Sequence, residues 1–220
     1  MWTLAGWPWP EPLRSMRGNG KAAAHPDGVR GFTDEEIREL RGRIECSRLT
    51  PAALVAWDCL IVFGLRPAEL QGLEISEQGG MPVADVRRVK RSSRGSSGPR
   101  QVVAVPPVCW PADCYGLVKR WHRYGVPENL LTVRSPGQLM TQQLRRLRQQ
   151  AAIAMELDQE LTAYSVRHAF ALRLAQRLGL HPREAATLMG HSPQVHLEVY
   201  GRRLDTPKLL EKVASLMAQH

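Results

Sequence analysis

The chain has 220 residues, enough for one large domain or two small ones, and its hydrophobic content of 43% is ordinary for a globular protein. A formal charge of +9, with 30 Lys and Arg against 21 Asp and Glu, favours a polyanionic partner, nucleic acid first and an acidic membrane surface second. No run of 18 apolar residues is present, so no membrane span is expected. The N-terminus lacks the basic region of a signal peptide. The four cysteines show neither CxxC nor zinc-finger spacing, which predicts free thiols in a reducing cytoplasm and no metal site.

The first 31 residues are rich in Gly and Pro and show no period, which predicts a flexible arm or linker. Regular structure is expected from Thr33, because Thr33 and Glu36 form a capping box ahead of apolar residues at helical spacing. A second helix is expected from Pro51 to Gly64. It is apolar on nearly every side, so it is predicted to be the central buried helix.

Residues 73–105 change to a strand-like pattern. Short runs at 73–75, 83–89 and 101–105 flank KRSSRGSSGPR, a basic loop rich in Ser and Gly, and predict a small antiparallel sheet with a mobile hairpin. Helical patterns return at about 112–123, 137–154, 163–178, 182–189, 193–200 and 207–218. The predicted fold is therefore mainly α with a small antiparallel β-sheet, in the α+β class.

Arg66 lies in GLRPAEL, between the apolar helix and a turn. A guanidinium there is costly unless it meets an anion. Two readings are open: a structural salt bridge to Glu69, three residues on, or a phosphate clamp that Glu69 orients.

Arg167 lies near the start of the helix expected over 163–178, for which Thr162 or Ser165 is the predicted cap. A cation in the first turns of a helix opposes the helix dipole, which indicates a negative group nearby, although a plain surface arginine is the alternative. The adjacent His168 is interpreted as a structural, hydrogen-bonded histidine.

The hairpin loop carries Lys90 among several arginines. The alternatives are a solvated loop or a finger that follows DNA, with one residue also acting as a proton donor. The arginines predicted to contact DNA are Arg87, Arg88, Arg91, Arg94 and Arg100.

The stretch MGHSPQVHLEVYGR predicts two helices that meet at a tight joint. Gly190 suits the end of one helix, and Ser192 and Pro193 suit the start of the next, with His191 between them. His191 alone would suit a structural histidine, and Tyr200 alone would suit packing. Two arginines, a lysine, a histidine and a tyrosine together suit attack on a phosphodiester, which needs cations, an acid and a nucleophile.

Three motifs resemble the catalytic domain of the tyrosine recombinases, the phage-integrase family: GLRPAEL, TAYSVRHAFALRLAQRLG and MGHSPQVHLEVY. The resemblance covers roughly residues 33–215. It implies that Arg66 and Arg167 grip the scissile phosphate, Lys90 protonates the leaving 5′ oxygen, His191 hydrogen-bonds the phosphate and Tyr200 forms a 3′-phosphotyrosine link. It implies no cofactor and no metal, and double-stranded DNA as the partner.

Two departures from the family pattern matter. Tyr164 stands where the family usually has a histidine, three residues before the second arginine; a phenol can hydrogen-bond but carries no positive charge, which predicts a slower or differently tuned enzyme. The expected organisation is an arm over 1–31 and a catalytic domain over 32–220, without the N-terminal core-binding domain that closes a clamp on DNA. Fewer phosphate contacts predict weak, salt-sensitive binding.

The tail over 207–218 fits an amphipathic helix, which either packs on its own domain or, as the resemblance implies, docks on a neighbouring protomer. The function expected is that of a DNA recombinase or integrase of a mobile element. The alternatives are a degenerate domain that binds DNA without efficient catalysis, a relaxing activity like that of type IB topoisomerases, and a basic protein that binds RNA or a membrane surface.

Overall fold

The computed structural model describes residues 30–87, 91–92, 95–96, 98–149 and 161–200, together with Leu210, Ala214 and Met217. The α-helices are α2 (Asp34–Cys46), α3 (Pro51–Phe63), α4 (Leu117–Tyr124), α5 (Glu128–Thr132), α6 (Pro136–Gln149), α7 (Ser165–Leu172), α8 (Pro182–Met189) and α9 (Pro193–Tyr200). A 3-10 helix, η1 (Pro67–Gly72), and a π-helical turn, η2 (Arg173–Arg177), join them. The strands are β1 (Leu73–Gln78), β2 (Met81–Val86), β3 (Arg91–Ser92), β4 (Gly95–Ser96) and β5 (Arg100–Val103). The predicted class, mainly α with a small antiparallel sheet, is confirmed.

Helices α2 and α3 pack against each other. The predicted capping box is present: the Thr33 hydroxyl accepts from the Glu36 amide at 3.2 Å, and the Glu36 carboxylate accepts from the Thr33 amide at 2.8 Å. Helix α3 begins at Pro51 and ends at Gly64, which adopts the left-handed conformation. Its side chains from Val55 to Phe63 are all buried, so the prediction of a central buried helix is confirmed.

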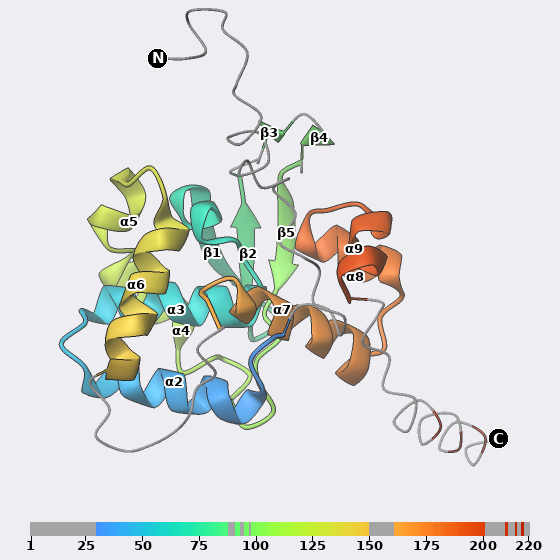
Figure 1. The fold of residues 1–220 in the computed structure, drawn as a ribbon, viewed down its shortest axis with the longest axis horizontal. Coiled ribbons are helices and arrows are strands. Elements are labelled where there is room, and N and C mark those ends of the chain that lie inside the picture. Colours follow the sequence, from blue (N-terminus) through green and yellow to red (C-terminus); the bar gives the residue numbers. More distant parts are fainter. Residues whose placement is uncertain are drawn as a thin grey trace, which may run out of the picture.

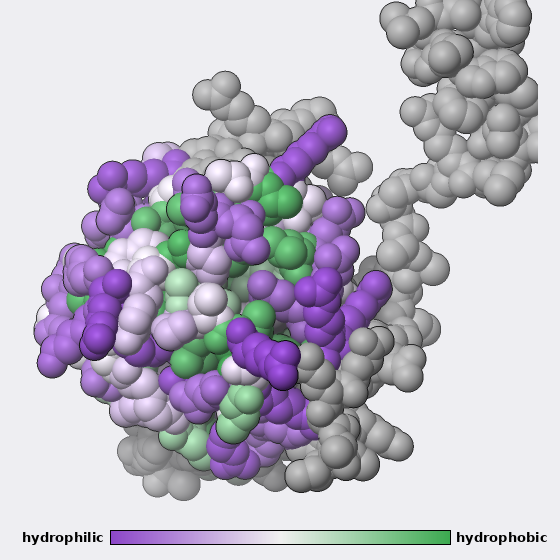
Figure 2. All heavy atoms as spheres, turned by 90° about the vertical axis from the view of Figure 1, so that its left-hand side faces the viewer, coloured by the Kyte–Doolittle hydropathy of each residue, from purple (hydrophilic) through white to green (hydrophobic). Residues whose placement is uncertain are grey.

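The sheet has the antiparallel order β1-β2-β5, with Leu73 opposite Val86 and Val86 opposite Arg100. Strands β3 and β4 form a separate small hairpin between β2 and β5. In Figure 1, α5 and α6 lie on one side of the sheet, α8 and α9 lie on the other, and α3 and α7 run beneath it. Seen from the α5 and α6 side, the surface is mainly hydrophilic, with smaller apolar areas between the polar side chains (Figure 2).

The helix predicted over 163–178 begins at Ser165 and changes to π-helical geometry at Arg173. The predicted cap is wrong: Tyr164 is the N-cap residue, and the Ser165 hydroxyl instead accepts from the Thr162 amide at 3.1 Å. The Leu178 amide bonds the Arg173 carbonyl at 3.1 Å, five residues back. This wider turn rotates Leu178 out of the apolar stripe, so Leu178 is exposed where regular helical spacing predicts burial.

The joint between α8 and α9 agrees with the sequence prediction. Gly190 closes α8 in the left-handed conformation, at φ +64°. The Ser192 hydroxyl accepts from the Val195 amide at 3.3 Å at the start of α9. None of the helices within the described ranges is long and apolar enough to cross a membrane. The arm predicted over 1–31 lies outside those ranges apart from its last two residues, and of the helix predicted over 207–218 only three single residues are described, each of them helical.

Candidate active site

Glu69 is the centre of a cluster of arginines. Its buried carboxylate accepts from the Arg66 amide and the Arg66 Nη1 group, both at 2.8 Å. It also accepts from Arg100 through two parallel bonds of 3.0 and 2.9 Å, and it lies 3.9 Å from Nη1 of Arg167. Helix η1 begins directly after Arg66 and so places Arg66 and Glu69 on one turn. The structure confirms the salt bridge between Arg66 and Glu69, which places Arg66 beside two further cations. The role of Arg66 as a phosphate clamp stays a prediction.

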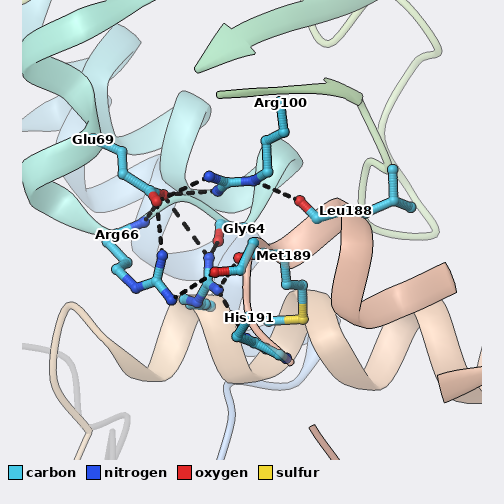
Figure 3. Close-up of polar contacts among 9 residues, drawn as sticks. Gly64, Arg66, Glu69, Arg100, Leu188, Met189 and His191 are labelled. Atoms are coloured by element: carbon cyan, nitrogen blue, oxygen red, sulfur yellow. Dashed lines mark hydrogen bonds and ion pairs between the residues drawn. The ribbon is translucent and has the colours of Figure 1, made fainter. Parts of the chain in front are cut away.

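The same three arginines bind three consecutive carbonyl groups at the end of α8 (Figure 3). Arg100 donates from Nε to the Leu188 carbonyl at 2.8 Å, and Arg66 donates from Nη2 to the Gly190 carbonyl at 3.2 Å. Arg167 donates to the carbonyl between them, that of Met189. The last carbonyls of a helix lack partners within the helix and carry a partial negative charge, which makes them suitable acceptors for guanidinium groups.

Arg167 is the most enclosed of the three, with 1% of its surface exposed. Its Nη1 group donates to the Gly64 carbonyl at 2.6 Å, so it joins the end of α3 to the end of α8. The reading of Arg167 as a plain surface residue is wrong. The negative group that its position predicted consists of two helix C-termini and the Glu69 carboxylate.

His191 lies in the joint after Gly190, and its Nδ1 atom is 3.3 Å from Nη2 of Arg167 (Figure 3). Burial lowers the pKa of His191 to about 3, and the neighbouring Arg167, His196, Arg66 and Arg100 lower it in the same direction. The ring is therefore neutral at pH 7. A neutral imidazole next to several guanidinium groups can donate one hydrogen bond without adding to their mutual repulsion.

The cluster keeps a surplus of positive charge. Burial of Glu69 opposes its ionisation, but bonds to Arg100 and the charges of Arg100, Arg167 and Arg66 hold its pKa below the usual value. Burial also lowers the pKa of Arg66, while Glu69 and then Tyr164 raise it by more. Three guanidinium groups and one carboxylate thus give a net charge of +2 at neutral pH. This surplus suits a phosphate, whose oxygens accept paired hydrogen bonds from arginine.

Tyr164 is 41% exposed and is the N-cap residue of α7. Its ring meets that of His168 edge to face, with centroids 5.5 Å apart, and its effect on the pKa of Arg66 places the phenol close to that guanidinium. His168 is buried on α7, as the structural interpretation requires. Among the described residues, no group of three or more His, Cys, Asp or Glu side chains gathers where a metal ion could bind.

Several predicted site residues fall outside the described ranges. These are Arg88, Lys90 and Arg94, while for Arg91 and Tyr200 only the backbone is described. Tyr200 is the last residue of α9, nine positions after His191. Arg87 is exposed and pairs with Asp85 at 3.1 Å.

Arg100 requires a correction. The sequence pattern groups it with the surface arginines of the hairpin, yet its side chain is buried against Glu69 and the end of α8. The sequence carries a signal for this: strand alternation places Arg100 on the same face as the buried Val102 and Ala104. His196 is a site residue that the motifs did not reveal. It is buried on α9, where the helical period carries it inward towards His191.

The chain belongs to the phage integrase family, whose sequence model matches residues 32–206. The resemblance drawn from the three motifs is thereby confirmed. None of the curated proteins matches the chain.

Solved structures show the same fold. The chain is similar to the Tn1549 transposon integrase in complex with transposon right-end DNA, with a TM-score of 0.59 and 18% identity over 89% of this chain and 68% of that one. It is similar to the XerA recombinase, also with a TM-score of 0.59 and 18% identity, over 86% of this chain and 65% of that one. For a lambda integrase dimer bound to a core site, the TM-score is 0.53 and the identity is 17%, over 93% of this chain and 56% of that one. In its match to another Tn1549 integrase complex with DNA, the chain spans 60% of that structure's length.

Proposed function

We propose that this chain cleaves and rejoins double-stranded DNA as a site-specific recombinase, through a 3′-phosphotyrosine link formed by Tyr200. One observation carries the proposal: Arg66, Arg100 and Arg167 converge on a single carboxylate beside a neutral histidine, with a net charge of +2. Attack on a phosphodiester gathers negative charge on the non-bridging oxygens. Cations that are already fixed in place stabilise that charge without having to reorganise.

Each residue has one part in the reaction. Arg66 and Arg167 bind the non-bridging oxygens, and the phenol oxygen of Tyr200 attacks phosphorus after losing its proton to solvent or a neighbouring base. The bond between phosphorus and the 5′ oxygen breaks, and Lys90 supplies the proton that this oxygen takes up. His191 donates a hydrogen bond to the phosphate. A 5′-hydroxyl then attacks the phosphotyrosine in the reverse sense, so strands are rejoined without ATP.

Glu69 and Arg100 support this arrangement. Because Glu69 bonds both Arg66 and Arg100, it fixes the direction in which the Arg66 guanidinium points. Arg100 in turn ties the carboxylate to the end of α8, next to the joint that carries His191. Neither residue needs to touch the DNA.

DNA is the proposed partner, bound through the proposed phosphate site and through a basic stretch of the sequence with Arg87, Arg88, Lys90, Arg91 and Arg94. The similar Tn1549 and lambda integrase structures contain DNA, and the lambda integrase structure is a dimer. Self-association on DNA through the predicted helix over 207–218 belongs to the same proposal. A protein without that helix that still assembles on DNA would count against it.

A covalent-capture experiment tests the chemistry and identifies the target sequence at the same time. The protein is incubated with a pool of nicked duplexes of randomised sequence, from which a cleaved strand cannot be rejoined. After denaturation, the DNA that remains attached is sequenced. We expect an enriched sequence with the wild-type protein and none with Tyr200→Phe.

The outcomes separate the alternatives. DNA that binds in a gel-shift assay but yields no adduct would favour a domain that binds without efficient catalysis. Tyr164, an exposed phenol where the family usually has a histidine, is the feature that suits that alternative. Relaxation of supercoiled DNA without joining of two sites would favour an activity like that of type IB topoisomerases.

A further inference from the structure

Helix α9 has an inverted pattern of burial. Of its side chains described between Pro193 and Glu198, that of His196 alone is buried, 3% exposed, while Val195 and Leu197 on either side face solvent. A helix that packs on a protein normally turns its apolar residues inward. Burying an imidazole instead is costly unless a partner satisfies it, so His196 needs a specific contact.

That contact is His191. The Nδ1 atom of His196 lies 3.0 Å from Nε2 of His191, and the two rings lie 5.3 Å apart with an angle of 31° between them. The helix supports this contact, because the His196 amide bonds the Ser192 carbonyl at 3.0 Å in the first turn. His191 therefore lies between Arg167 on one ring nitrogen and His196 on the other.

The positions of the protons follow from the donors. A guanidinium can only donate, so Nδ1 of His191 must accept the bond from Arg167. A neutral His191 then carries its one proton on Nε2 and donates it to Nδ1 of His196. Because Nδ1 of His196 accepts this hydrogen bond, a neutral His196 carries its own proton on Nε2.

We propose that His196 is a positioning residue: it accepts the hydrogen on Nε2 and so holds the His191 ring in one orientation, while Arg167 keeps that ring in the Nε2-protonated form. This proposal rests on the proposed function, because the hydrogen on Nε2 is the one that His191 donates to the scissile phosphate. In the absence of DNA, His196 accepts that hydrogen. When DNA binds, a phosphate oxygen takes its place without any change in the protonation of His191.

The obvious alternative is that His196 only fills space. Two substitutions separate the roles. In His196→Asn the amide oxygen lies close to the position of Nδ1 and can still accept from His191, whereas His196→Ala removes the acceptor. A role in packing alone would make Asn no better than Ala.

The first measurement is independent of DNA cleavage. Two-bond nitrogen–proton NMR spectra of the whole chain at pH 7 report the tautomer of each of its 7 histidines, with His191→Asn and the exposed His122→Asn as assignment controls. We expect a neutral, Nε2-protonated His191 in all three proteins, because Arg167 remains on Nδ1. In His196→Ala the loss of the acceptor should shift the Nε2 resonance of His191 and speed the exchange of its hydrogen with water, whereas His196→Asn should resemble the wild type. A charged or Nδ1-protonated His191 in the wild type would overturn the proposal, even if the proposed function were correct.

The second measurement is the rate of covalent adduct formation at saturating DNA. We expect His196→Ala to lower this rate about 10-fold at unchanged affinity, since a misdirected donor misses the phosphate. His196→Asn should recover to within about threefold of the wild type, and circular dichroism checks that both variants fold. Equal losses in the two variants would overturn the positioning role. An adduct absent from every protein would refute the proposed function instead and leave the NMR result to decide on the histidine pair.

Discussion

Two buried carboxylates, Glu69 and Asp58, each hold arginine side chains, yet they form different kinds of site. Asp58 lies fully buried on α3 and accepts from Nε of Arg41 at 3.2 Å and from Nη2 of Arg120 at 2.6 Å. Arg41 also pairs with Glu45 and stacks on the rings of two aromatic residues, Trp110 and Tyr115. Two cations meet two anions, and the charges around Asp58 cancel.

At Glu69 the balance is different, because three arginines meet one carboxylate. The same arginines also donate hydrogen bonds to backbone carbonyls and to a neutral histidine, and none of these acceptors removes the surplus charge. A cluster of buried arginines is therefore not by itself a ligand site. The count of opposing charges distinguishes the Asp58 cluster, in which the charges cancel, from the Glu69 cluster, which keeps a positive surplus that an anion could neutralise.

The largest effect is expected from neutralising the two carboxylates separately. Glu69→Gln should lower the free energy of unfolding by about 3 kcal/mol, because it leaves buried arginines without their anion. Asp58→Asn should lower it by less, because burial already disfavours the charged form of Asp58. Only Glu69→Gln should also lower the rate of adduct formation, by about 100-fold or more, because it releases the arginines that we propose bind the phosphate. Urea unfolding and covalent capture measure the two effects, with the exposed Glu77→Gln as control. Equal losses of rate in both variants would remove the distinction.

A smaller effect is expected from the two arginines at the base of the hairpin. Arg100→Ala should lower the adduct rate about 10-fold, since it removes the link between Glu69 and α8. Arg87→Ala, which removes a side chain that is 64% exposed, should change stability by less than about 0.5 kcal/mol. Arg87→Ala should instead lower the affinity for DNA. The salt dependence of the binding constant should fall by the amount expected for about one phosphate contact. Unfolding curves and binding titrations at several salt concentrations test both; a strong loss of stability in Arg87→Ala would contradict the assignment.

A weaker effect still is expected from substitutions of the exposed Tyr164, which interacts with Arg66. Tyr164→His would place the family's usual residue beside Arg66 and should raise the adduct rate severalfold, whereas Tyr164→Phe removes the hydroxyl and should lower it. Initial rates of capture measure both. If neither substitution changes the rate, Tyr164 has no part in the site.

The smallest expected effect is on the pH dependence of stability, where the two carboxylates should act with opposite sign. The pKa of Glu69 is lowered in the folded protein, so its contribution is present above its unfolded pKa and is lost as pH falls through the folded one. Burial raises the pKa of Asp58 even against Arg41 and Arg120, so its contribution declines as pH rises above its unfolded value. As pH falls, the free energy of unfolding of Glu69→Gln should therefore decrease less steeply than that of the wild type. The free energy of unfolding of Asp58→Asn should decrease more steeply. Parallel curves in all three proteins would contradict this.

Local signals explain what the sequence predicted well. Helices α8 and α9 have the expected bounds because Gly190, Ser192 and Pro193 each favour one backbone conformation at the joint. Helix α4, in contrast, begins at Leu117 rather than near residue 112. The preceding Cys114 and Tyr115 have positive φ angles, and the Arg120 side chain bonds both of their carbonyls, a side-chain contact that periodicity does not reveal.

The site itself could be predicted only in part. Arg66, Arg167 and His191 were found because their motifs resemble those of a family, and the structure brings these three together. The role of Arg100 and the pairing of His191 with His196 depend on which faces of β5 and α9 turn inward, and that is decided by packing across the whole domain. The charge balance that separates Glu69 from Asp58 likewise depends on distances that no local pattern encodes.

The three carbonyls at the end of α8 have a consequence for folding. The arginines that bind them lie 124, 88 and 22 residues away in the sequence and come from three separate elements. Contacts of such long range form only after the chain has closed large loops. A partly folded chain therefore lacks the complete arginine cluster. If the proposed function holds, DNA cleavage should begin only after α8 and α9 are in place.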